Sequence, residues 1–154
     1  MYENLRGLKN VAETLATEEN TALAVGSGSL KVFATPEMIR LIETAAAELV
    51  EKNLPHELTS VGTSVNVKHT APTPCNMKIR AEVEITAVDG RKIIFEVAAF
   101  DERGEIGRGL HERFIVDRKK FQLKASLKLD PAVAPQRYDS SNLMPASIRN
   151  AVHC

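Results

Sequence analysis

The sequence predicts an α+β domain in which an antiparallel β-sheet wraps around one long central helix. An apolar segment of helical periodicity begins at Thr35 and Pro36 and stops near Asn53. Four segments with the alternation of β-strands follow, between Ser60 and Val116, and short turns join them. Because the helix is apolar over far more than a narrow stripe, we expect the sheet to wrap around it, and a dimer to cover the remaining sheet face and edge.

The central helix has a start signal and one unusual acidic residue. Thr35 is expected to cap the free N–H groups of the first turn, and Pro36 suits the first helical position. Between Glu37 and Lys52 the apolar side chains share one arc: Met38, Ile39, Leu41, Ile42, Ala45, Ala46, Leu49 and Val50. Glu43 falls on this apolar side, where a carboxylate is costly unless it is paired, hydrogen-bonded or protonated.

The segments before the helix have weaker patterns. Residues 1–19 form a polar lead-in for which the spacing of Leu5, Leu8, Val11 and Leu15 indicates a helix. We expect a first strand from Thr21 to Gly28, broken by the glycines at its end. These glycines do not form a phosphate-binding loop, because no Lys-Ser or Lys-Thr follows them.

The four later strands are expected at 60–70, 77–87, 92–100 and 106–116. In the first of them Val61, Thr63, Val65, Val67 and His69 share one face. Asp89-Gly90 predicts a tight hairpin between the second and the third. After Phe121 the periodicity ends, so we divide the chain into a lead-in (1–19), a domain (20–121) and an extension (122–154).

Composition excludes several classes of function. The formal net charge of the 154 residues is +0, which gives no bulk attraction to nucleic acid or to an anionic membrane. No apolar run approaches the ~18 residues of a membrane span, and the N-terminus does not resemble a signal peptide. Cys75 and Cys154 lack metal-ligand spacing, so we expect a reduced, cytoplasmic protein without metal or cofactor. We interpret Cys75 as an inert small residue rather than a reactive thiol.

Three residues have the character of a catalytic group: Thr35 at a helix start, Glu43 on the apolar side of that helix, and His69 in phase with buried valines. A carboxylate in apolar surroundings is a stronger base, an imidazole carries protons near neutral pH, and a hydroxyl orients either partner. Each also has a structural interpretation, as a cap, a solvent-reaching carboxylate and a core histidine. The sequence contains no Gly-x-Ser-x-Gly or HExxH motif of serine hydrolases or zincins.

Five short motifs, in order and spacing, resemble the fluoroacetyl-CoA thioesterase-like family, whose members have the hotdog fold. They are AVGSG at 24–28, VFATP at 32–36, TSVGT at 59–63, VDGR at 88–91 and HERFIVD at 111–117. The likeness covers roughly Glu18 to Phe121. The catalytic threonine, glutamate and histidine of the family fall on Thr35, Glu43 and His69.

The resemblance implies a metal-independent hydrolase that splits a short-chain or small polar acyl-CoA, the partner molecule, into acid and coenzyme A. It implies a homodimer with sites at the interface, Glu43 as nucleophile or general base, His69 as proton carrier and Thr35 as orienting hydroxyl. Gly62 and Arg113 correspond to substrate-pocket residues, and we assign Phe33 to the same substrate-binding set. Coenzyme A is substrate here and not cofactor.

Two alternatives keep the fold and change the function: a non-catalytic acyl-CoA binding module and a hotdog acyl-CoA hydratase. The absence of a paired Asp/His motif near the helix counts against the hydratase. The basic residues that would contact the phosphates of coenzyme A are not decided by the sequence; Lys68, Arg103, Lys119 and Lys120 are the candidates.

Overall fold

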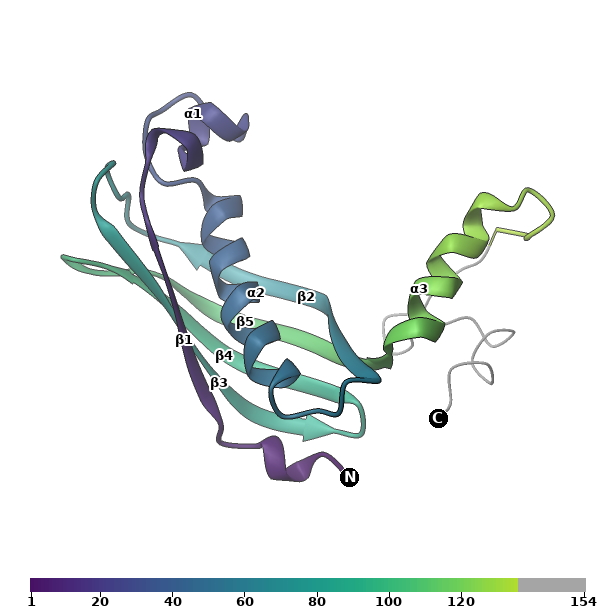
Figure 1. Ribbon diagram of the computed structural model, residues 1–154. Coiled ribbons are helices and arrows are strands. Elements are labelled where there is room, and N and C mark those ends of the chain that lie inside the picture. The colour runs from purple at the N-terminus through teal and green to yellow at the C-terminus, as the bar shows by residue number, and fades with distance from the viewer. Residues whose placement is uncertain (136–154) are drawn as a thin grey trace.

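The computed structural model describes residues 1–135 and consists of one antiparallel sheet with a long helix on its concave face (Figure 1). The strands follow the order β1-β3-β4-β5-β2 across the sheet: β1 (Lys9–Leu15), β2 (Leu58–His69), β3 (Lys78–Asp89), β4 (Lys92–Asp101) and β5 (Gly104–Asp117). The helices are α1 (Ala22–Val25), α2 (Thr35–Glu51) and α3 (Arg118–Ser126), with short 3₁₀ turns at Glu3–Leu5, Glu18–Asn20 and Leu127–Leu129. This is the α+β arrangement expected, a sheet wrapped around one helix.

Helix α2 is the centre of the hydrophobic core. Its buried residues are Met38, Leu41, Ile42, Ala45, Ala46, Leu49 and Val50, which confirms the predicted apolar arc except for Ile39, which is half-buried. They pack against the inner face of the sheet, where Ile85, Ile93 and Phe95 are fully buried. Each of these large side chains contributes roughly 1.5–3 kcal/mol of burial free energy, so the packing holds α2 firmly against the sheet.

The start of α2 differs from the prediction. The N-cap is Ala34, and no described side chain caps the first turn, so the expectation that Thr35 caps the helix is wrong. Thr35 is instead the first helical residue, with Pro36 in the first turn as predicted. Its hydroxyl is therefore available for a different contact, described below.

The two predictions before α2 are wrong. Lys9–Leu15 is an edge strand, β1, and not a helix. It turns Asn10, Ala12 and Thr14 toward the core side and leaves Val11 and Leu15 exposed, so its apolar residues do not mark the buried face. The expected strand from Thr21 is the short helix α1, in which the Thr21 hydroxyl accepts a hydrogen bond from the Ala24 N–H.

Strand β2 contains a bulge that changes which residues face α2. Gly62 pairs with Arg113 of β5, but Ser64 pairs with the next residue, Glu112, so Thr63 is an extra residue in β2. Directly paired residues share a sheet face. Even-numbered residues therefore face inward up to Gly62, whereas the inward residues after the bulge are odd-numbered, ending at His69.

The predicted single face for Val61 through His69 is thus wrong for Val61 and Thr63, which lie before and within the bulge. The consequence matters for the site. Gly62 and His69 are seven positions apart, an odd number, and would lie on opposite faces of a regular strand. The bulge brings both to the face that carries α2.

The remaining strands agree with the predictions to within a few residues, and Asp89 pairs with Lys92 across the expected hairpin. After β5 the chain continues into α3, which projects away from the sheet (Figure 1). The part of the predicted extension beyond residue 135 lies outside the described residues. Within residues 1–135 the helices lack the combination of length and apolar character that a membrane crossing requires.

Candidate active site

The first cluster of the site joins the start of α2 to the end of β2. Thr35 Oγ1 lies 2.7 Å from His69 Nδ1, a hydrogen bond between two side chains 34 residues apart in the sequence. The Thr35 hydroxyl either donates to a bare Nδ1 or accepts from a protonated one, so the pair allows both tautomers of the imidazole. The contact fixes the ring of His69 against the first turn of α2.

His69 is half-buried and its second nitrogen is unused. Burial lowers the pKa of His69 below its ordinary value, and the backbone at Ala71 acts in the opposite direction. The buried Nε2 atom has no hydrogen-bond partner among the described residues. A neutral imidazole with an available nitrogen is suited to accept or deliver a proton.

A cavity of about 250 Å³ lies beside this pair. Its walls include Ala22, Val32 and Phe33 together with Thr35 and His69. Phe33 is 1% exposed and belongs to the core, so it forms a fixed wall there. A larger cavity, of about 520 Å³, lies over β1, β3 and β4 and contains none of the predicted site residues.

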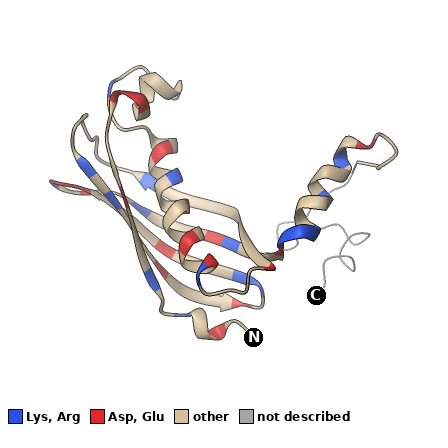
Figure 2. Ribbon diagram, in the orientation of Figure 1, with Lys and Arg blue, Asp and Glu red and all other residues tan. Residues whose placement is uncertain are grey.

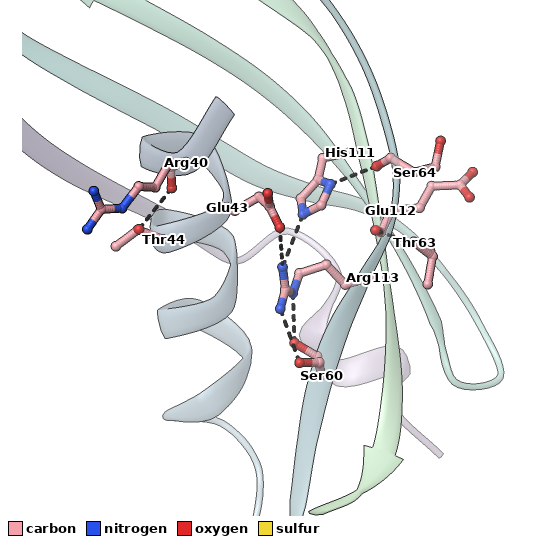
Figure 3. Close-up of polar contacts among 9 residues, drawn as sticks. All are labelled: Arg40, Glu43, Thr44, Ser60, Thr63, Ser64, His111, Glu112 and Arg113. Atoms are coloured by element: carbon pink, nitrogen blue, oxygen red, sulfur yellow. Dashed lines mark hydrogen bonds and ion pairs between the residues drawn. The ribbon is translucent and has the colours of Figure 1, made fainter. Parts of the chain in front are cut away.

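The second cluster surrounds the buried guanidinium of Arg113 on β5 (Figure 3). Arg113 Nε donates to Ser60 Oγ at 2.8 Å, and Nη2 donates to the Ser60 carbonyl oxygen at 3.1 Å. Its Nη1 lies 3.6 Å from Glu43 Oε2 and 3.3 Å from His111 Nε2. Burial lowers the pKa of Arg113, and the charges of Glu43 and Glu51 oppose that effect. The guanidinium nevertheless stays charged, as arginine does throughout proteins.

His111 lies beside this guanidinium and is fully buried. Its Nδ1 is 2.8 Å from the Ser64 carbonyl oxygen, an atom that only accepts hydrogen bonds. Nδ1 therefore carries the proton, and Nε2 presents a lone pair to Arg113. The ring stacks on Phe95 with centroids 5.8 Å apart. Burial lowers the pKa of His111, so the neutral form is favoured.

Gly62 provides space in this cluster. A Cβ at position 62 would lie 2.8 Å from Glu43 Oε2 and 3.3 Å from both Arg113 Nη1 and His111 Cε1. A side chain there would collide with the carboxylate and crowd the guanidinium. Because Gly62 has no side chain, the Glu43 carboxylate and the Arg113 guanidinium lie close to the β2 backbone, and we call this place between the two groups the recess at Gly62.

Within one protomer the predicted residues form these two separate clusters. Thr35 and Glu43 are eight positions apart on α2, a rise of about 12 Å, and Gly62 and His69 are seven apart on β2, about 23 Å. No hydrogen bond or ion pair within residues 1–135 joins Glu43 to His69. The side chain of Glu43 is 44% exposed, so the predicted apolar surroundings of its carboxylate are wrong for the protomer.

Two residues of the second cluster were not predicted. Ser60 and His111 hold the guanidinium of Arg113, and neither was assigned a role from the sequence. The available signal was the spacing of His111 and Arg113: residues two apart on a strand share a face. The Ser60 contact spans 53 residues and depends on the pairing of β2 with β5, which the sequence pattern does not specify.

Known proteins with similar sequences and structures are thioesterases. The fluoroacetyl-CoA thioesterase of Streptantibioticus cattleyicolor is 37% identical over 98 residues, which make up 64% of this chain and 70% of the relative. The solved structure of fluoroacetyl-CoA thioesterase FlK has a TM-score of 0.75 at 29% identity, over 80% of this chain and 96% of that one. A Thermus thermophilus member of the thioesterase superfamily has a TM-score of 0.73 at 28% identity, over 80% and 93% of the two chains.

These similarities show that the fold is that of the hotdog thioesterases. The model of the fluoroacetyl-CoA-specific thioesterase family matches residues 16–119, and the chain belongs to that family of thioester hydrolases. One mutant of the fluoroacetyl-CoA-specific enzyme was solved with fluoroacetate and CoA; its structure has a TM-score of 0.71 at 30% identity, over 75% of this chain and 98% of that one.

Proposed function

We propose that the protein hydrolyses a short-chain or small polar acyl-CoA to the free acid and coenzyme A, with Glu43, His69 and Thr35 as its catalytic residues. Family membership supports thioester hydrolysis, and the two clusters supply groups suited to it. The observation that carries the assignment is the 2.7 Å contact between Thr35 Oγ1 and His69 Nδ1 at the wall of a 250 Å³ cavity. That volume suits a small acyl group better than a long chain.

Glu43 starts the reaction in one of two ways. As a nucleophile, its carboxylate attacks the thioester carbon, the C–S bond breaks, and water then hydrolyses the acyl-glutamyl anhydride. As a general base, it takes a proton from a water molecule that attacks the same carbon. In the first route His69 gives a proton to the departing sulfur and recovers one from the water that cleaves the anhydride. In the second, the proton that Glu43 takes from water passes to His69 and from there to the sulfur. Thr35 orients the imidazole in both. The proposed reaction uses these side chains and water, and no step of it needs a metal or cofactor.

The substrate carbonyl is proposed to lie in the recess at Gly62. With no Cβ at this position, a ligand atom approaches the strand backbone closely and contacts both Glu43 and Arg113. The charge of Arg113, 6% exposed, favours a polar or negatively polarised group on the acyl chain. Phe33 is proposed as an apolar wall of the acyl pocket, and its position in the lining of the cavity supports this proposal.

We propose that a homodimer joins the two clusters into one site. β2 is an edge strand of the sheet, and its residues 62–66 are exposed, so it presents an unprotected hydrogen-bonding edge. Antiparallel pairing of two copies of β2 about an axis between Val65 and Asn66 would set Gly62 opposite His69 of the partner subunit. That register would bring Glu43 of one subunit close to the imidazole of His69 of the partner subunit.

The phosphates of coenzyme A require cations near the site. Basic residues follow one another at the start of α3, where Arg118, Lys119 and Lys120 are adjacent (Figure 2). Lys68 lies next to His69 at the C-terminal end of β2, and Arg103 lies in the turn between β4 and β5. The candidates thus lie in three different regions of the protomer.

Release of free thiol from a panel of acyl-CoAs of graded length and polarity tests the proposal. We expect turnover with the shortest substrates, and at least 100-fold lower kcat/KM for Glu43→Ala and His69→Ala with unchanged melting temperature. Equal rates for both variants and the parent would refute the catalytic assignment. Saturable binding by calorimetry without turnover would indicate a binding module, and loss of enoyl-CoA absorbance would indicate a hydratase.

A further inference from the structure

His111 has a contact pattern that a core histidine does not need. A histidine that only fills space in the core needs packing for its ring, and the stack on Phe95 supplies this packing. Both ring nitrogens of His111 are nevertheless engaged, Nδ1 with the Ser64 carbonyl oxygen and Nε2 with Arg113 Nη1. The two contacts connect the bulge of β2 to the charged end of Arg113.

The direction of these hydrogen bonds is fixed by the groups involved. The Ser64 carbonyl accepts, which assigns the proton to Nδ1, and Arg113 only donates, which requires a bare Nε2. One neutral tautomer therefore satisfies both neighbours. The other tautomer and the imidazolium would each place an N–H against the guanidinium.

The charges around His111 act on it from several elements. Arg113 on the same strand disfavours an imidazolium, whereas Glu43 on α2 and Glu112 on β5 favour one. The Ser64 carbonyl on β2 supports an N–H at Nδ1, and Phe95 on β4 contributes no charge. Burial disfavours the charged ring most strongly. The neutral imidazole is thus the state that fits the cluster.

Within residues 1–135, Arg113 Nη1 has two side-chain acceptors, His111 Nε2 and the half-exposed Glu43. Ser60 holds the Nε and Nη2 side of the guanidinium and leaves the Nη1 end to His111 and Glu43. The Nη1 end is the one that faces the recess at Gly62. Its position therefore depends on the lone pair of His111.

We propose that His111 is a positioning residue: its Nε2 lone pair orients the Nη1 end of Arg113 and so holds the Glu43 carboxylate at the recess. The role deepens the proposed function and rests on it. His111 does not contact the substrate. A displacement of a catalytic group by about 1 Å lowers rates by up to about 100-fold, so a small movement of Arg113 has a measurable effect.

Two substitutions separate the two nitrogens. Asparagine places an amide N–H near the position of Nδ1 and keeps the bond to the Ser64 carbonyl, but it does not reach Arg113. Glutamine places an amide oxygen near the position of Nε2 and keeps an acceptor for Arg113. We expect His111→Asn to lower kcat about 10- to 100-fold with little change in KM, and His111→Gln to recover most of that loss. His111→Phe, which keeps the stack on Phe95, should be as slow as His111→Asn.

Nitrogen-15 NMR of the full-length protein provides a readout that does not require activity. In the parent at pH 7, we expect His111 to have a protonated Nδ1 and a bare Nε2, and the Arg113 Nε–H to exchange slowly with solvent. In His111→Asn that exchange should accelerate, and in His111→Gln it should return toward the parental rate. Should the parent fail to hydrolyse any acyl-CoA, the proposed function falls, and these spectra still decide the role of His111.

The proposal is overturned by parental kcat in folded His111→Asn or His111→Phe, or by unchanged Arg113 exchange in either. If these variants do not fold, the nitrogen-15 NMR spectrum of the parent decides the role of His111. An imidazolium, or a proton on Nε2, at pH 7 contradicts the orientation required.

Discussion

Gly62→Ala changes the recess while sparing the backbone. A Cβ at this position would lie 2.8 Å from Glu43 Oε2, well inside the optimal contact of about 3.5 Å. The carboxylate must therefore retreat by roughly half an ångström or more. The Glu43 side chain is 44% exposed and has room to move, so the fold should lose about 1 kcal/mol or less.

The effect on catalysis should be much larger. The added methyl occupies the space proposed for the substrate carbonyl and moves Glu43 away from Arg113. We expect kcat/KM to fall about 10- to 100-fold in a thiol-release assay with the best short acyl-CoA. The melting temperature, measured on the same preparation, should fall by no more than a few degrees.

Gly109→Ala is the matched control. It lies on the neighbouring strand, β5, and faces the same side of the sheet, but a Cβ there would lie 2.1 Å from the Asn66 carbonyl oxygen of the β2 backbone. This contact cannot relax by rotating a side chain, so Gly109→Ala should lose stability in addition to activity. Parental activity in Gly62→Ala, or a loss of stability as large as that of the control, would refute the assignment of the recess.

Four further predictions follow from the same contacts. Thr35→Val removes the hydrogen bond to His69 and should lower kcat at least 10-fold at constant stability, while Thr35→Ser keeps most of the activity; equal rates would contradict the orienting role. Arg113→Met leaves the Ser60 carbonyl and His111 Nε2 unpaired and should lower the free energy of unfolding by about 1–3 kcal/mol in urea titrations, with a neutral result arguing against the cluster. Burial lowers the folded-state pKa values of His69 and His111, so the unfolded chain binds more protons than the folded one in acid. The free energy of unfolding should therefore be highest above about pH 6.5 and fall as the pH drops toward the lowered pKa values. A higher free energy of unfolding at pH 5.5 than at pH 7.5 would contradict this. Prolonged EDTA treatment should leave turnover unchanged, because no step of the proposed reaction uses a metal ion; a loss of turnover that added metal restores would disprove the metal-free reaction.

The sequence predicted those parts of the fold whose residues carry their own pattern. Helix α2 was recognisable because its apolar arc is continuous, and the strands from β2 to β5 because apolar and polar residues alternate. Strand β1 was not, because its buried face consists of Asn10, Ala12 and Thr14, and Asn10 is held there by a hydrogen bond to the Ala45 carbonyl. The pattern of an edge strand with a small, polar inner face resembles that of a loop or a surface helix.

The candidate site was predictable only in part for a related reason. Thr35, Glu43 and His69 were assigned from pattern and family resemblance. The structure brings Thr35 and His69 into contact, whereas Glu43 lies apart from them in the second cluster. The bulge at Thr63 depends on how β2 pairs with β5, and a single strand's alternation does not reveal an extra residue. The contacts of Ser60 and His111 with Arg113 follow from that pairing, so they become visible only in three dimensions.

Mixing Glu43→Ala with His69→Ala tests most directly whether two subunits share each site. We expect each variant to be inactive alone, and in the proposed homodimer subunit exchange makes about half of the dimers mixed. If Glu43 works with His69 of the partner subunit, each mixed dimer has one intact site of two, and the mixture regains about one quarter of the parental activity. A mixture that exchanges subunits and stays as inactive as its components would contradict the shared site.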